Sequence, residues 1–266
     1  MTVTVEKSGP VTTVVHSRPE ARNAMDPGSA EALVEAFLAF ERDPEASVAV
    51  FWGAGGAFCA GWDLKYAGSL LGRSEPLKEL DFPEDGGPVP RGPMGPSRLA
   101  LSKPVVAAVA GPAVAGGFEL ALWCDLRVME EDAYFGVYCR RWGIPLIDGG
   151  TVRLPRLVGE GRALDIILTG RKVPADEAYR IGLCERIAPK FKAREVAEDL
   201  AQEIARFPQA CVRADRRSMY RAHGLSVADG LRAEWETSVR VVEEEGLAGA
   251  LRFASGKGRG GDFGAI

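Results

Sequence analysis

One stretch, residues 103–122, restricts the possible folds of this chain more than any other part of the sequence. Its apolar run at 105–110 lacks the polar alternation of a half-exposed strand, so we expect a strand covered on both faces. Gly116 and Gly117 predict a turn whose backbone N–H groups are free at the start of a helix. Glu119 falls in the first turn of this otherwise apolar helix. A buried carboxylate is costly unless it is paired or used, so Glu119 is either a helix cap or a functional group.

Strand and helix patterns alternate along most of the chain. They alternate up to about residue 188, and only helical patterns follow. We therefore predict an α/β core over residues 1–190 and a C-terminal helical region over residues 191–266. Residues 67–97 are crowded with glycine and proline and predict a long loop, which is either a lid or binding loop or a solvated insertion.

Composition and short motifs exclude several classes of protein. A formal net charge of −4 over 266 residues argues against nucleic-acid binding. No apolar run approaches the roughly 20 residues of a membrane helix, and the N-terminus lacks a signal-peptide pattern. Five scattered cysteines predict free thiols in the cytoplasm, and the two histidines show no metal-ligand spacing. The G-x-G-x-x-G match at 256–261 follows a helix rather than a strand, so we expect no dinucleotide cofactor.

Two stretches far apart in the chain carry the motifs of one family. Residues 58–65, FCAGWDLK, resemble the F-x-A-G-x-D-L motif of the crotonase (enoyl-CoA hydratase/isomerase) superfamily. Residues 103–122 resemble its second motif, K-P-x-x-A-A-x-x-G-x-A-x-G-G-G-x-E-L-A. Residues 18–25 resemble the early CoA-binding loop, and residues 168–170 and 175–183 match later landmarks. The resemblance covers nearly the whole chain, in order.

This resemblance implies a fold and a ligand. The implied fold is a superhelix of strand-strand-helix turns whose C-terminal helices assemble a homotrimer or a hexamer. The implied substrate is an acyl-CoA thioester, with no cofactor beyond the coenzyme A that the substrate carries. Its carbonyl oxygen would accept hydrogen bonds from the N–H groups of Ala60 and Gly116, which form an oxyanion hole for an enolate. The implied substrate contacts are Arg22, Ala24, Ala60, Gly61, Trp62, Asp63, Leu64, Gly116 and Gly117, with a weaker one from Lys257.

The resemblance also indicates candidate catalytic groups. Hydratases of the family use two glutamates that flank one water molecule, and Glu119 matches the first of them, as a general acid/base. Cys139 stands where the second is expected. A thiol is a poor replacement for a carboxylate, so Cys139 is a buried small side chain or a thiol activated by Arg140 and Arg141. Asp148 is a further candidate, and its alternative role is to cap the helix that begins there.

Three functions therefore remain open at this point. The leading hypothesis is an enoyl-CoA hydratase with Glu119 as the general acid/base. The first alternative is an enoyl-CoA isomerase, or another crotonase chemistry that needs only one carboxylate. The second alternative is a CoA-ester-binding protein with little turnover.

Overall fold

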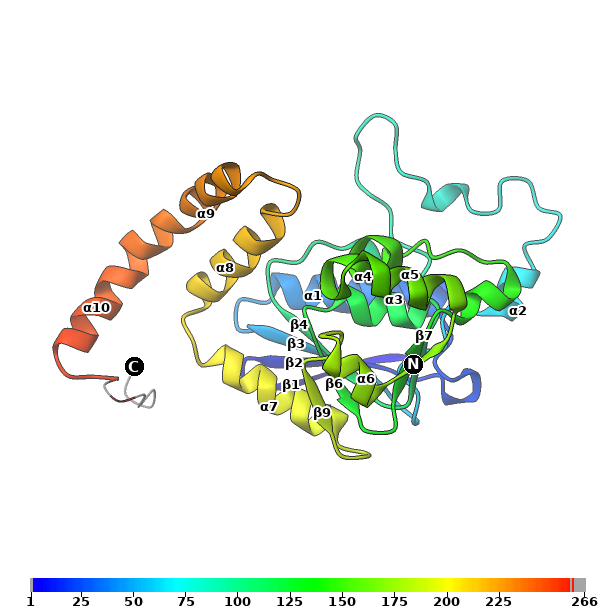
Figure 1. Cartoon of the computed structure of the whole chain (residues 1–266), viewed down its shortest axis with the longest axis horizontal. Helices are drawn as coiled ribbons and strands as arrows, with labels where there is room; N and C mark the ends of the chain where they lie inside the picture. The colour runs from blue at the N-terminus through cyan, green and yellow to red at the C-terminus, as the bar shows by residue number, and fades with distance from the viewer. Residues whose placement is uncertain (1, 259, 261–266) are drawn as a thin grey trace. The chain divides into compact units, whose positions relative to one another are not determined.

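The computed structural model describes residues 2–258 and 260 and divides into two compact units (Figure 1). The division falls between Gln202 and Glu203. The first unit contains all the strands of the described residues, and the second contains helices. The predicted α/β class and the predicted helical region at the C-terminus are both confirmed.

The larger sheet of the first unit has six strands. In spatial order they are β1 (Val3–Ser8), β2 (Val11–His16), β3 (Val48–Gly53), β4 (Val105–Val109), β6 (Leu126–Glu130) and β9 (Arg186–Ala188). The β1–β2 hairpin is antiparallel and the remaining pairs are parallel. Every residue of β2 and β4 is buried, as the unbroken apolar run at 105–110 predicts for a strand covered on both faces.

A smaller sheet lies beside the helix that follows β4. It consists of β5 (Pro112–Val114), β7 (Tyr134–Gly136) and β8 (Lys172–Pro174). The chain passes from β4 through β5 into α3 (Gly116–Trp123), which is the strand-strand-helix order that the family resemblance implies. Between β7 and β9 the chain forms the helices α4 (Gly150–Val158), α5 (Glu160–Thr169) and α6 (Ala175–Arg180).

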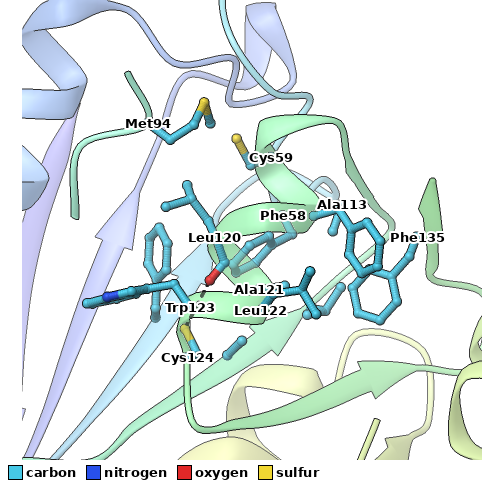
Figure 2. Packing of buried hydrophobic residues seen from close by; sticks show 14 of the residues in the cluster. Phe58, Cys59, Met94, Ala113, Leu120, Ala121, Leu122, Trp123, Cys124 and Phe135 are labelled. Carbon is cyan, nitrogen blue, oxygen red and sulfur yellow. Dashed lines mark hydrogen bonds between the residues drawn. The ribbon is translucent and has the colours of Figure 1, made fainter. Parts of the chain in front are cut away.

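Helices cover both faces of the larger sheet. On one face, α1 (Pro27–Arg42) begins at Asp26, whose carboxylate accepts a hydrogen bond from the Ser29 N–H at 2.8 Å. Its apolar side and α3 enclose the core, in which Phe37 contacts Phe51 and Trp123 edge to face. On the opposite face lies α7 (Ala193–Ala205), where Glu198 accepts a hydrogen bond from the Thr13 hydroxyl. The core therefore lies between the sheet and α3, the helix that carries Glu119 (Figure 2).

The long segment predicted at residues 67–97 is only partly irregular. It follows α2 (Leu64–Gly68) and contains 3₁₀ turns at Lys78–Leu80 and Pro96–Arg98. Most of its side chains are exposed, but the segment ends in buried residues that include Met94. The segment is therefore anchored where it returns to the core.

The second unit is helical throughout its described residues. It contains α8 (Gln209–Arg221), α9 (Val227–Val241), a π-helical turn at Val242–Gly246 and α10 (Leu247–Ala254). Large apolar side chains on these helices are exposed, among them Leu231, Trp235 and Leu251. Within residues 2–258 and 260, no helix has both the length and the apolar character needed to cross a bilayer.

Candidate active site

The first turn of α3 is the centre of the candidate site. Ala115, which precedes it, has φ 55° and ψ −126°, a conformation that a residue with a Cβ rarely adopts. Such strain costs roughly 1–3 kcal/mol and is found mainly at functional positions. Gly116 is the first residue of α3, so its N–H has no acceptor within the helix. A Cβ at Gly116 would overlap the Met94 side chain, which explains the glycine.

Glu119 is buried and held by backbone amides. Its side chain lies in a helix whose residues are all buried, and Glu119 itself is 2% exposed. One carboxylate oxygen, Oε1, accepts hydrogen bonds from the N–H groups of Asp148 at 2.9 Å and Gly150 at 2.8 Å. Burial, together with the negative charge of Asp148, raises the pKa of Glu119 to about 7, although the amide donors oppose this. A carboxyl group with this pKa can both accept and release a proton near neutral pH.

Asp148 holds a turn of the chain and does not cap a helix. The N-cap of α4 is Gly149, and no side-chain hydrogen bond is formed there, so the capping interpretation is wrong. Instead, Oδ1 of Asp148 accepts a hydrogen bond from the Met94 N–H at 3.1 Å and another from the Ser97 hydroxyl. Burial raises the pKa of Asp148, while these two donors favour its ionised form. One oxygen of this carboxylate is therefore engaged in holding the 94–97 turn.

Cys139 faces the site as a protonated thiol. It lies in the 3₁₀ turn Tyr138–Trp142 and is 8% exposed. Burial, and then the charge of Glu119, raises its pKa above the ordinary value for a thiol. Arg140 does not reverse this shift, and its Nε donates instead to the Ile167 carbonyl. Of the two interpretations of Cys139, the small buried thiol is the one that fits this environment.

The backbone N–H of Ala60 is already used within the protein. It donates to the Arg22 carbonyl at 3.0 Å, so it is not available to a thioester oxygen, and its assignment to the oxyanion hole is wrong. Gly61, the next residue, lies close to the beginning of α3. A Cβ at Gly61 would be only 3.1 Å from the Gly116 nitrogen. Trp62 forms a parallel bridge with Met25, in which the Met25 N–H donates to the Gly61 carbonyl. The N–H of Trp62 points away from this bridge, because neighbouring N–H groups on a strand alternate in direction.

The expected CoA-binding loop is built by an ion-pair network. The Arg18 guanidinium donates to the Asp63 carboxylate at 3.0 Å and to the Ala24 carbonyl at 2.5 Å. Asp63 also caps α2 by accepting from two backbone N–H groups. Asp63 therefore shapes the loop, whereas the Arg22 side chain is exposed. Lys257 lies in the second unit, and its contact with CoA stays a prediction.

A pocket of about 70 Å³ brings many of these residues together. Of the predicted site residues, those that line it are Ala60, Trp62, Leu64, Gly116, Glu119, Cys139 and Asp148. Arg22, Ala24, Gly61, Asp63 and Gly117 do not line it. The lining residues that the sequence did not indicate are Pro93, Met94, Ala115, Tyr138, Trp142, Ile144, Pro145 and Ile147. For Met94, the available signal was one large apolar residue in a turn of glycine and proline.

The polar groups of the pocket are few. Two carboxylates and one thiol converge among apolar and aromatic walls. Among the described residues, no group of three or more histidine, cysteine, aspartate or glutamate side chains could hold a metal ion. The arrangement can stabilise an oxyanion at the Gly116 N–H and move a proton at Glu119.

Comparison with known proteins defines the class to which this fold and site belong. The enoyl-CoA hydratase/isomerase family model matches residues 6–84 and 95–254, and the chain belongs to this family. The family is the crotonase superfamily of the motif resemblance, so the protein is a crotonase-family enzyme.

Individual relatives narrow the comparison further. The chain is 33% identical to "Enoyl-CoA hydratase EchA19" of Mycobacterium tuberculosis, over 94% of this chain and 92% of that protein. It is also 33% identical to a carnitinyl-CoA dehydratase of Salmonella arizonae, over 93% of each. A crystal structure of an enoyl-CoA hydratase from Mycobacterium tuberculosis superposes with a TM-score of 0.85 at 32% identity, covering 96% of both chains.

Proposed function

We propose that the protein is an enoyl-CoA hydratase that adds water across the 2,3 double bond of a 2-enoyl-CoA. The observation that carries this proposal is the position of Glu119. It is a buried carboxylate with a pKa of about 7, in the same helical turn as the unpaired N–H of Gly116. Family membership and the names of the relatives support an acyl-CoA thioester as the substrate.

The proposed reaction uses one oxyanion hole and one carboxylate. The thioester oxygen accepts hydrogen bonds from Gly116 N–H and from Trp62 N–H, which replaces the amide of Ala60. Glu119 takes a proton from a water molecule while the water oxygen bonds to C3 of the substrate. The electrons of the double bond move to the thioester oxygen, and the enolate forms. Glu119 then returns the proton to C2, so the atoms of one water are added and the carboxylate is regenerated.

One observation favours a second candidate function. The second carboxylate, Asp148, holds the 94–97 turn through Oδ1, and Cys139 stays protonated. A site with one free base suits the isomerisation of a 3-enoyl-CoA, in which Glu119 would move a proton from C2 to C4. The first alternative, isomerisation, therefore remains a candidate, and a CoA-ester-binding protein is the outcome if neither reaction occurs.

The assembly and the compartment are also part of the proposal. We place the protein in the cytoplasm as a homotrimer or as a hexamer built from two trimers. Support for the assembly comes from large exposed apolar side chains on α9 and α10, such as Trp235 and Leu251. Support for the compartment comes from the five cysteines, all of which are unpaired.

One absorbance assay distinguishes the three functions. The conjugated thioester of a 2-enoyl-CoA absorbs in the near ultraviolet, and hydration removes this absorbance. We expect the wild-type protein to deplete it with crotonyl-CoA. A gain of absorbance from a 3-enoyl-CoA would instead identify an isomerase. Tight binding of both ligands without either change would identify the binding protein and contradict the hydratase.

A further inference from the structure

The turn that carries Met94 is fixed in place by several independent contacts. Gly92 and Gly95 exchange two backbone hydrogen bonds, of 3.1 and 2.9 Å, and so close a tight turn around Pro93 and Met94. The carboxylate of Asp148 accepts from the Met94 N–H and the Ser97 hydroxyl. These contacts make the turn a rigid part of the pocket wall, although it ends a long exposed segment.

The Met94 side chain fills space beside the reacting groups. It is 1% exposed and lines the pocket that also contains Glu119. A Cβ built on Gly116 would lie 2.7 Å from Cγ of Met94 and closer still to its sulfur. Figure 2 shows the Met94 side chain extending toward the beginning of α3, near Cys59. The thioether thus occupies volume immediately next to the proposed oxyanion hole.

The space left beside Met94 is small. The pocket has a volume of about 70 Å³, and one water-sized group occupies about 10–15 Å³ by this measure, so about five to seven such groups fit. Trp62 and Pro93 close one side of the pocket. The same two residues, together with Leu80, also line a second hollow of only about 10 Å³. The pocket therefore has room for a short acyl group, and the adjoining hollow is too small to receive a longer one.

Met94 lies in a part of the chain that the family model does not match. The family model matches residues 6–84 and 95–254, so Met94 falls in the interval between the matched ranges. The contact between Met94 and Gly116 is therefore made by a segment outside the matched part of the chain.

We propose that Met94, held by Asp148, is the specificity-determining residue of the acyl pocket and restricts the enzyme to short acyl groups of about four to six carbons. This inference rests on the proposed function, because it takes the pocket beside Gly116 and Glu119 as the acyl site. Met94 acts by occupying volume and takes no part in the chemical step.

Binding of saturated acyl-CoAs tests the inference without any chemistry. Calorimetry with butyryl-CoA and decanoyl-CoA measures how much affinity the six additional methylene groups contribute. For the wild type we expect a gain of less than about threefold, because the pocket cannot bury them. Met94→Ala removes three heavy atoms and makes room for about two methylenes, so we expect the decanoyl-to-butyryl affinity ratio to rise about tenfold.

Two further variants distinguish the effect of removing Met94 volume from the pocket from the effect of weaker packing in the core. Met94→Leu conserves the volume and is expected to keep the wild-type ratio. Met129→Ala is the matched control, because Met129 is fully buried in β6 and does not line the pocket. It should lose stability and keep the wild-type ratio.

The outcomes distinguish this inference from the proposed function. The inference is overturned if the wild type binds decanoyl-CoA at least tenfold more tightly than butyryl-CoA, or if Met94→Ala and Met129→Ala give the same ratio. If the affinity ratios are as predicted but no enoyl-CoA is turned over, the selection for short acyl groups is supported and the hydratase proposal is contradicted. If the wild type binds neither probe, both proposals fail.

Discussion

At the scale of single residues, the site depends on how one carboxylate is kept inside an apolar helix. Glu119 is almost completely buried, and the backbone N–H groups of Asp148 and Gly150 partly compensate for the lost hydration. Burial still dominates, so its pKa rises from 4.5 to about 7. The protonated form is therefore favoured by folding, and this contribution to stability is lost as the pH rises through 7.

This environment predicts the pH dependence of the reaction. The water-activating form of Glu119 is ionised, so kcat/KM should rise with pH and level off above about pH 7. Asp148→Asn removes the neighbouring negative charge, which helps to raise this pKa, so the rise should move to lower pH. The amide oxygen of the new side chain can still accept from Met94 and Ser97.

The control for this measurement is a carboxylate that does not line the pocket. Asp165 lies on α5, is half exposed and pairs with Arg171, which follows this helix. Asp165→Asn should leave the pH profile of kcat/KM unchanged. An identical profile for the wild type and Asp148→Asn would show that the charge of Asp148 has no effect on the catalytic group.

At the scale of elements, α3 is fixed at both ends. Its first turn is set by the strained Ala115, and its last turn by Arg127 on β6. The Arg127 side chain is 1% exposed and donates to the carbonyls of Cys124 at 2.9 Å and Leu183 at 3.0 Å. It also forms an ion pair with Glu185 at 2.5 Å. Arg127 thus joins the end of α3 to the approach of β9.

Removing this guanidinium should destabilise the first unit. Arg127→Met leaves several buried carbonyls without a donor, and we expect the free energy of unfolding to fall by about 3 kcal/mol. Arg171→Met is the control, because Arg171 also pairs with acidic side chains, Asp165 and Glu177, but is one-third exposed. Its loss should cost less than about 1 kcal/mol. Urea denaturation measures both values, and equal losses would contradict the anchoring role of Arg127.

The sequence predicted the elements that have a clear local pattern and missed two strands of three residues. Strand β4 and helix α3 were predictable because an unbroken apolar run and a glycine turn fix them locally. Strands β5 and β8 were not, since three residues are too few to show a period. The site residues also divide into those that a local motif indicates and those that only a contact between distant segments reveals. Glu119 and Gly116 lie in the motif, whereas the bond between Asp148 and Met94 joins residues 54 positions apart.

The error at Ala60 has the same physical origin. The sequence shows that residue 60 is small. It does not show that the Ala60 N–H donates to the Arg22 carbonyl, because this contact depends on how the two loops pack together. Sequence patterns place side chains on faces and do not specify which of two neighbouring amides faces a pocket. The donor that we propose is therefore the N–H of Trp62 in place of that of Ala60.

At the scale of the whole molecule, the second unit has exposed apolar side chains of the kind found at interfaces between subunits. Leu231, Trp235 and Leu251 are each more than half exposed on α9 and α10. Light scattering during gel filtration should give a mass three or six times that of one chain. Trp235→Glu places a charge on this surface and should reduce the mass to that of a monomer.

A surface substitution elsewhere controls for the added charge. Leu71 is 92% exposed in the long segment, and Leu71→Glu should leave the assembly intact. A monomeric wild-type protein would contradict the proposed assembly.

The central claim is that Glu119 carries out the hydration of an enoyl-CoA thioester. The most direct measurement is the rate at which the wild type and Glu119→Gln deplete the near-ultraviolet absorbance of crotonyl-CoA. Glutamine can still accept from Asp148 and Gly150 but cannot take a proton from water. We expect turnover by the wild type and a loss of at least about 10²-fold in kcat for the variant. No depletion by the wild type, or an equal rate for the variant, would contradict the proposed function.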